Sequence, residues 1–273
     1  MLFFNQYKDV GFFAVHGFLE SGDISFGKLK HKLNKNKIPN FYAVDLHAHS
    51  EAENINDFNF TTCIERVERE YVAYKFKYAK IYLIGFSMGG VIASHLASKY
   101  GADKLVLISP AFKYGGTKRL TSGIINFFKN EKDSKSTMVE FLSSKLKQEE
   151  VDEFVKQYLN QDNGDDPDEK LLKLQFMKKL GKVKISVFTN FAKLVSFVRK
   201  NLKPIDIPTR IYHSETDELI PLEAAYFIFQ HVIHGDKRLI ITSQIEHRIL
   251  ASKQRESVMN EIIMFLYDKK KIR

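Results

Sequence analysis

The feature that most constrains the fold is a serine placed between an apolar run and a helix-like segment. The apolar residues 81–84 lead directly into Gly85-Phe86-Ser87-Met88-Gly89, and the largely apolar residues 91–97 follow. This G-x-S-x-G pattern predicts a tight strand-to-helix turn, because small residues two positions before and after the serine avoid clashes with neighbouring backbone. The turn exposes the serine hydroxyl at the start of a helix, whose dipole favours developing negative charge. This context favours a nucleophilic serine over a plain glycine turn.

Short apolar runs recur along the chain, and most are followed by a segment with helical spacing of apolar residues. Strands are predicted at residues 11–15, 41–45, 80–84, 104–108, 209–213 and 238–242. Helices are predicted at residues 60–76, 88–100, 222–232 and 255–267. Strands that alternate with helices form a mostly parallel sheet with helices on its faces. We therefore expect an α/β fold.

The middle of the chain lacks convincing strands. Amphipathic segments occur instead at residues 120–129, 137–146, 171–180 and 187–198, and an acidic, turn-rich break at residues 160–169 divides them. Pro204 and Pro208 then mark the return to the sheet, because proline cannot continue a helix. We interpret residues 1–112 and 203–273 as one core and residues 113–202 as a helical insertion.

A nucleophilic serine requires an imidazole as general base and a carboxylate that orients this imidazole. In folds with a G-x-S-x-G turn, the chain order is serine, acid, histidine. His247 lies in the loop after the last predicted strand and is the expected base. His231 and His234 also follow Ser87, but they precede that strand and are expected at the wrong edge of the sheet.

An acidic cluster follows the strand predicted at residues 209–213. Glu215, Asp217 and Glu218 compete there for the role of orienting acid. Asp217 is the expected residue because of its short side chain and its position in the loop, where functional residues concentrate. The remaining carboxylates are expected to be solvated.

The negative charge that develops in acyl transfer requires two preorganised backbone donors. These are usually the amide after the nucleophile and one from the loop after an early strand, here the amides of Met88 and Phe18. Gly17 lets that loop approach a substrate carbonyl. His16 is expected to brace the loop rather than act as a base, because it precedes Ser87 in the chain.

The composition of the chain indicates where the protein is located and which kinds of partner it binds. Cys63 is the one cysteine among 273 residues, so an intrachain disulfide is impossible and a reducing cytoplasm is the simplest expectation. Residues 1–18 lack the features of a signal peptide, and no window reaches the roughly 18 apolar residues of a membrane span. The net charge of +9 is compatible with weak peripheral contact with anionic membranes. The basic residues are spread along the chain apart from a terminal cluster at 269–273. We therefore expect no nucleic-acid partner.

Together these motifs resemble the bacterial carboxylesterase and monoacylglycerol-lipase branch of the alpha/beta-hydrolase superfamily, over residues 12–110 and 209–267. The resemblance rests on H-G-F at residues 16–18, G-F-S-M-G-G at 85–90, D-x-x-I-P at 217–221 and H-R-I at 247–249. It implies an α/β-hydrolase core that needs no cofactor. It also implies a helical cap over the active site, inserted after the sixth strand, which matches residues 113–202.

Two departures from the family pattern affect the pocket rather than the triad. Glu246 stands where the family often has a glycine before the catalytic histidine, and D-L-H-A-H-S-E at residues 45–51 replaces a G-H-G-like loop. His47 and His49 form an H-x-H pair. Because this pair has no third ligand, we expect no metal site.

The site residues and the resemblance predict a serine-dependent carboxylic ester hydrolase of the esterase or lipase type. It would act through an acyl-enzyme on short- to medium-chain esters or monoacylglycerols. The same chemistry serves thioesterases, perhydrolases, carbon–carbon bond hydrolases and amidases, since a fold does not decide a substrate. A non-catalytic binding protein with a basic surface is a further alternative, which the presence of all three triad residues disfavours.

The insertion carries more apolar residues than freely solvated helices would. Some are expected to pack on the sheet domain and others to line an acyl pocket that prefers medium chains over acetate. The residues are Ile124, Ile125, Phe127, Phe128, Phe141, Leu142, Phe188, Phe191, Leu194 and Phe197.

Overall fold

The computed structural model describes residues 9–36, 38, 40–113, 183–217, 219–243, 247–252 and 254–266. Within these residues, six strands form one sheet in the order β2-β1-β3-β4-β5-β6, and every neighbouring pair is parallel. The strands are β1 (Val10–Val15), β2 (Phe41–Val44), β3 (Lys80–Phe86), β4 (Lys104–Ile108), β5 (Thr209–Ser214) and β6 (Lys237–Thr242). The predicted strands and the parallel sheet are confirmed, with strand ends that differ by at most about two residues.

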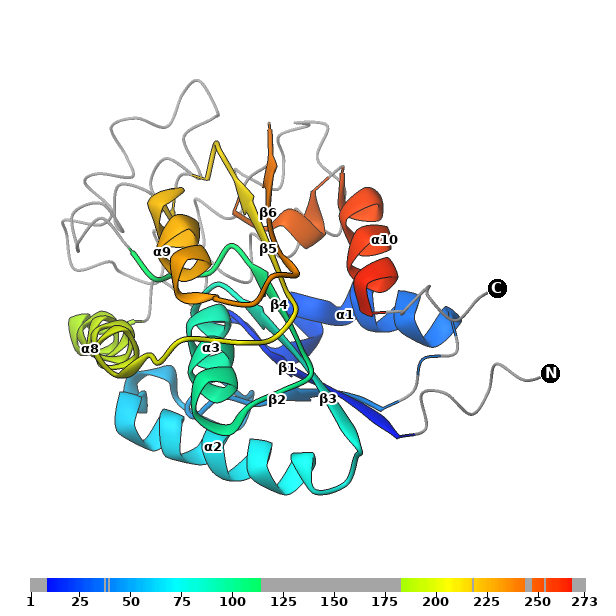
Figure 1. Ribbon diagram of the computed structural model, residues 1–273. Coiled ribbons are helices and arrows are strands. Elements are labelled where there is room, and N and C mark those ends of the chain that lie inside the picture. The colour runs from blue at the N-terminus through cyan, green and yellow to red at the C-terminus, as the bar shows by residue number, and fades with distance from the viewer. Residues whose placement is uncertain are drawn as a thin grey trace, which may run out of the picture.

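Helices connect the strands and cover both faces of the sheet (Figure 1). One face carries α1 (Gly22–Lys35) and α10 (Arg255–Leu266), and the other carries α2 (Phe60–Lys75), α3 (Met88–Tyr100), α8 (Ile185–Asn201) and α9 (Glu223–His231). Two short 3-10 helices, η1 (Ile55–Asp57) and η2 (Ile249–Ala251), lie in loops. In the described part of the chain, no helix is both long and apolar enough to cross a membrane.

The hydrophobic core is divided by the sheet into two clusters. Phe13 and Leu83 belong to the cluster under α2, α3, α8 and α9, whereas Phe12 and Ile84 belong to the cluster under α1 and α10. Neighbouring residues of a strand point to opposite faces, so each strand contributes to both clusters. All six residues of β1 are buried as a result, which explains why the strand reads as a continuous apolar run.

Helix α1 is a feature that the sequence analysis did not predict. It has a glycine in its interior and several lysines, so its apolar spacing is weak. Ser21 nevertheless caps the first turn by accepting a hydrogen bond from the Ile24 amide. Phe26, Leu29 and Leu33 are buried at helical spacing against the sheet. The cap and these three residues are the signal that could have predicted the helix.

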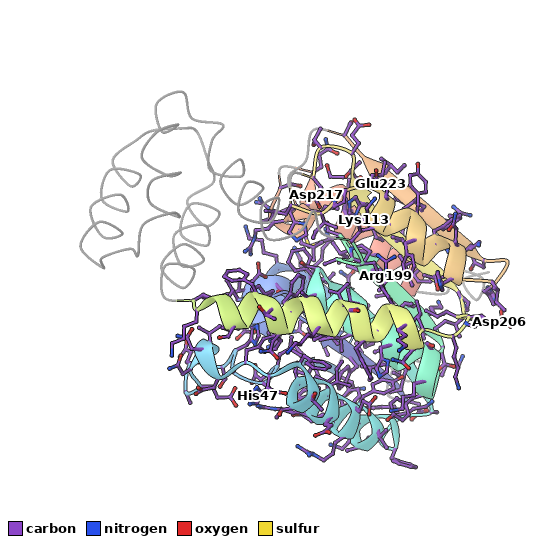
Figure 2. The ribbon with its side chains drawn as sticks, turned by 90° about the vertical axis from the view of Figure 1, so that its left-hand side faces the viewer. His47, Lys113, Arg199, Asp206, Asp217 and Glu223 are labelled. Atoms are coloured by element: carbon purple, nitrogen blue, oxygen red, sulfur yellow. The ribbon has the colours of Figure 1, made fainter. Side chains whose placement is uncertain are left out.

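Helix α8 is the described part of the predicted insertion. It lies across α2 and α3, as Figure 2 shows, and its residues Phe191 and Leu194 are buried in the core. Arg199 Nη1 donates to the Phe112 carbonyl (2.8 Å), which ties the end of α8 to the segment after β4.

The predicted helical segments at residues 120–129, 137–146 and 171–180 lie outside the described residues, as do their apolar side chains. The cap and its boundaries at residues 113 and 202 therefore stay a prediction. Among the described residues, the segment that begins at residue 113 follows β4, so a cap inserted after a sixth strand is not confirmed.

Candidate active site

Ser87 is the single residue between β3, which ends at Phe86, and α3, which begins at Met88. Its backbone has φ 53° and ψ −118°, a strained conformation for a residue with a side chain. Its amide donates to the Ile108 carbonyl of β4 (2.9 Å), and its carbonyl accepts from the Gly90 amide (2.9 Å). Hydrogen bonds on both sides of the residue thus hold the strained turn in place.

The two glycines of the motif allow this turn by close backbone approach. A Cβ atom on Gly89 would lie 1.9 Å from the Val15 carbonyl oxygen. A Cβ atom on Gly85 would lie 2.5 Å from the Gly89 carbonyl oxygen. Both partners are backbone atoms that cannot rotate away. The end of β1 therefore packs directly against the turn that carries Ser87.

Three side chains from three loops at the carboxyl edge of the sheet form a continuous chain of hydrogen bonds. His247 Nε2 lies 3.0 Å from Ser87 Oγ, and His247 Nδ1 lies 2.7 Å from Asp217 Oδ2. Ser87 is 8% exposed and His247 is 6% exposed, while the Asp217 side chain is fully buried. A carboxylate only accepts hydrogen bonds, so Nδ1 carries the imidazole proton and Nε2 accepts from the serine hydroxyl.

Asp217 is held by its own loop after β5 (Figure 2). Its Oδ1 atom accepts hydrogen bonds from the amides of Leu219 (3.0 Å) and Ile220 (2.8 Å), while Oδ2 faces His247. All of these partners are donors, so the pocket suits a carboxylate, which only accepts. Glu215, in the same loop, is exposed, and Glu218 lies outside the described residues.

A second histidine, which the sequence analysis did not select, supports this loop. His213 lies in β5 and is fully buried; its Nε2 atom donates to the Ile220 carbonyl (3.0 Å) and lies 3.8 Å from Asp217 Oδ2. Burial lowers the pKa of His213, although the charge of Asp217 acts in the opposite direction. A neutral imidazole therefore braces the backbone that donates to Asp217. In the sequence, its place in an apolar strand resembles that of an ordinary core histidine.

Ser109 supports the His247 loop from β4. It follows this strand, has φ 45° and is fully buried. Its hydroxyl donates to the His247 carbonyl (2.9 Å), and its amide donates to the Tyr212 carbonyl (2.8 Å). The Phe86 ring packs on the imidazole, with ring centroids 5.2 Å apart. Sequence reasoning missed Ser109 because serine after a strand is a common turn residue.

The loop after β1 lies against the serine. A Cβ atom on Gly17 would lie 2.9 Å from the Phe86 ring and 3.5 Å from the Ser87 Cβ atom, so a larger residue would displace the ring. The Phe18 amide follows in this loop, and the Met88 amide opens α3. The two amides predicted as oxyanion donors therefore belong to segments that adjoin Ser87.

His16 supports the loop after β1. The side chain is fully buried, and its two ring nitrogens contact two different backbone segments. Nδ1 donates to the Gly17 carbonyl (2.8 Å), and Nε2 accepts from the Leu46 amide (3.2 Å) after β2. This is a neutral imidazole with both nitrogens engaged, which is the arrangement of a structural histidine.

Residues 10–254 match the family described as Serine aminopeptidase, S33. The chain belongs to this family. A search of the curated proteins gave no match. Among solved structures, the chain is similar to an esterase from Exiguobacterium antarcticum, with 18% identity and a TM-score of 0.60, over 94% of this chain and 92% of that one. The α/β-hydrolase fold expected from the sequence is thereby confirmed.

Two further solved structures have the same fold at low identity. A monoacylglycerol lipase from Paleococcus ferrophilus matches with 19% identity and a TM-score of 0.58, over 94% of this chain and 93% of that one. A 2-hydroxy-6-oxo-6-phenylhexa-2,4-dienoate hydrolase from Rhodococcus matches with 14% identity and a TM-score of 0.62, over 93% and 89%.

In this α/β-hydrolase, the competing histidines lie away from Ser87. His231 ends α9, and its Nδ1 atom donates to the Phe227 carbonyl (2.8 Å). His234 Nδ1 accepts from the Asp236 amide (3.0 Å) in the loop before β6. Both residues therefore stand at the amino edge of the sheet, opposite to the edge that carries the serine.

The other candidate groups of the hydrolase fold do not form a second site. Burial raises the pKa of the Cys63 thiol to about 12, so this cysteine is not a reactive nucleophile. His49 is buried, and its Nδ1 atom donates to the His47 carbonyl (2.8 Å). In Figure 2, His47 and Asp217 lie on opposite sides of α8. Within the described ranges, no three His, Cys, Asp or Glu side chains gather in a way that suits a metal ion.

Proposed function

We propose that the chain is a serine-dependent carboxylic ester hydrolase that acts through an acyl-enzyme on Ser87. The observation that carries the proposal is the hydrogen-bond chain from Ser87 through His247 to the buried Asp217. It is combined with a strained backbone at the serine, which is a common property of functional sites. A protein that only binds a partner would have no need of this combination.

In the proposed acylation step, the Ser87 oxygen bonds to the ester carbonyl carbon while His247 Nε2 takes the hydroxyl proton. The carbonyl electron pair moves to the oxygen, and the amides of Phe18 and Met88 donate to this oxyanion. The carbon–oxygen bond to the alcohol then breaks, and the leaving oxygen receives the proton from His247. Asp217 holds the second imidazole proton on Nδ1 and stabilises the imidazolium.

In the proposed deacylation step, water takes the place of the alcohol. His247 accepts one water proton as the water oxygen attacks the acyl carbon, and the same proton returns to the Ser87 oxygen when the acid leaves. Among the described residues, the amides of Phe18 and Met88 donate to no carbonyl in a turn or loop. The proposal requires both amides to donate to the oxyanion in both steps.

An aromatic cluster beside the proposed oxyanion donor supports an apolar acyl group. The Phe18 ring lies 5.2 Å from Phe191 and 5.9 Å from Phe188, both on α8, and 5.9 Å from Phe58. Phe58 and Phe191 are core residues, each 3% exposed, whereas Phe18 and Phe188 are only partly buried. We propose that these last two rings contact the acyl group, since aromatic side chains commonly line ligand pockets. We propose short- to medium-chain esters or monoacylglycerols as substrates, with about fourfold better kcat/KM for each methylene buried, which corresponds to about 0.8 kcal/mol.

The remaining expectations from the sequence belong to the same proposal. Residues 113–202 would form a cap, and the contact of α8 with Phe18 supports a role of this segment near the substrate. The single, buried cysteine supports a reducing cytoplasm as the location.

Labelling with a fluorophosphonate tests the nucleophile. We expect a covalent adduct on Ser87 in the wild-type protein, located by peptide mass spectrometry, and no adduct in Ser87→Ala. Hydrolysis of nitrophenyl esters from acetate to dodecanoate, together with monoacylglycerols and acyl-CoA, then tests the substrate class. Absence of labelling would contradict the proposal, and faster hydrolysis of acyl-CoA than of every oxygen ester would replace it with a thioesterase.

A further inference from the structure

Two loops that must be aligned for the proposed chemistry come from opposite ends of the chain. The loop after β1 carries the Phe18 amide, and the loop after β6 carries His247. An ion pair joins them, in which Arg248 Nη1 donates to Glu20 Oε1 at 2.5 Å. The side chains of Arg248 and Glu20 are only 10% and 6% exposed, so the pair is almost entirely removed from solvent.

The ion pair continues into the backbone beside Phe18. Glu20 Oε2 accepts from the Ser25 hydroxyl (2.5 Å), and the Ser25 oxygen accepts from the Gly17 amide (3.2 Å). Arg248 Nη2 also donates to the Ile24 carbonyl (3.4 Å) at the start of α1. A continuous set of contacts therefore runs from the residue after His247 to the residue before Phe18.

The loop that receives these contacts is under backbone strain. Leu19 has φ 62°, which is unfavourable for a residue with a side chain, and the turn is closed by a long hydrogen bond of 3.4 Å from the Glu20 amide to the Gly17 carbonyl. Such a turn persists only when its surroundings over-determine it. The Glu20 carboxylate is the side chain of this turn that is fixed from two directions, by Ser25 and by Arg248.

A buried ion pair by itself adds little to the stability of a fold. Removing two charges from water is costly, and an apolar pair of similar volume is often as stable. The planar guanidinium of Arg248, however, contacts Glu20 through Nη1 and the Ile24 carbonyl through Nη2, so it fixes the carboxylate relative to the start of α1. The arrangement therefore fits a role in alignment better than a role in stability.

We propose that Arg248 and Glu20 are positioning residues that keep the Phe18 amide and the His247 imidazole aligned across Ser87. The proposal rests on the ester hydrolase function proposed above. Neither residue touches the reacting atoms. They act by fixing the loops on which the two catalytic groups are carried.

Three variants test this role, namely Arg248→Met, Arg248→Lys and the double variant Glu20→Gln with Arg248→Met. The double variant leaves no unpaired buried charge, so it should fold even where Arg248→Met alone does not. Steady-state kinetics with a nitrophenyl ester separate kcat from KM. An alkyl boronic acid, whose boron binds the Ser87 oxygen as a tetrahedral adduct while the proton passes to His247, reports on oxyanion stabilisation.

We expect the double variant to melt near the wild-type temperature and to lose about 10- to 100-fold in kcat, because misplacement by about 1 Å has effects of this size. KM should stay within about threefold, and boronate affinity should fall by the same factor as kcat/KM. Arg248→Lys should recover only part of the loss, because it retains the charge but not the planar fork that also reaches the Ile24 carbonyl. Arg210→Met is the matched control, since Arg210 is 12% exposed and pairs with Asp236 at 2.7 Å on the amino edge of the sheet.

Wild-type kcat in the double variant would overturn the proposal, because the pair would then serve only the fold. A rise in KM with unchanged kcat would also overturn it, since Arg248 would then contact substrate. Equal losses of kcat in Arg210→Met would assign the effect to general loosening. If the wild-type protein neither hydrolyses esters nor reacts with fluorophosphonate, the proposed function fails first, and this proposal falls with it.

Discussion

Asp217→Asn replaces one carboxylate oxygen by an NH2 group and leaves the size of the side chain almost unchanged. The consequence depends on which way the new amide points. With its oxygen toward the amides of Leu219 and Ile220, both backbone hydrogen bonds remain and the NH2 group faces His247. With the opposite orientation, the NH2 group faces two backbone donors.

The free-energy difference between the two orientations of the new amide follows from the hydrogen bonds that each one keeps. The opposite orientation loses two hydrogen bonds of about 1 kcal/mol each and leaves buried donors without acceptors. The first orientation is therefore favoured by at least about 2 kcal/mol, or about 30-fold. His247 Nδ1 must then accept from the NH2 group, so the proton moves to Nε2, which can no longer take a proton from Ser87. We expect kcat to fall by about 10⁴-fold.

The assay is steady-state hydrolysis of a nitrophenyl ester, with circular dichroism and thermal unfolding to verify the fold. Glu215→Gln is the matched control, since Glu215 lies exposed in the same loop and should change kcat by no more than about twofold. A kcat within about tenfold of wild type in Asp217→Asn would refute the tautomer argument. A large loss in Glu215→Gln instead would move the role of the acid to that residue.

Three further predictions concern the residues around the serine. Ser87→Ala and His247→Ala should each lower kcat by several orders of magnitude and the double variant scarcely more, because the two act as a unit; additive losses would contradict this. Ser109→Ala should lower the free energy of unfolding by about 1 kcal/mol in urea titrations and kcat by about tenfold, whereas an unchanged kcat would limit Ser109 to the fold. Burial lowers the pKa of His213, so the unfolded chain binds a proton at higher pH and wild-type stability falls as pH drops below about 6.5. His213→Gln, which keeps a donor for the Ile220 carbonyl, should flatten this dependence in thermal unfolding, and an unchanged slope would refute the assignment.

The fold was largely predictable because the sheet is covered on both faces. Strands buried in this way read as continuous apolar runs between turn residues, and β4 and α3 begin and end where the sequence predicts. Helix α1 was not predicted from the sequence, because only Phe26, Leu29 and Leu33 of its buried face are large and apolar. Several lysines lie between them. Its partner surface on the sheet, which stabilises it, is not visible in local sequence.

The three residues in the hydrogen-bond chain could be selected because each lies in the turn or loop that follows a strand, in the order typical of the fold. The residues that support these three side chains could not be selected in this way. Ser109 contacts a carbonyl of the His247 loop, and Glu20 contacts Arg248 from 228 positions away in the chain. Such contacts depend on how distant segments meet in three dimensions, and a single sequence contains no local pattern for them.

The hydrogen bond between Arg199 and the Phe112 carbonyl has a consequence for the evolution of such chains. It joins the segment after β4 to the last turn of α8, the helix by which the chain returns to the sheet, and it involves none of residues 114–182. The entropic cost of closing a longer insertion grows slowly, by about 0.6 kcal/mol for each doubling of length. We therefore expect that a change in the length of the segment between residues 113 and 183 leaves this contact in place. Substrate range and bond-breaking chemistry are free to diverge at different rates.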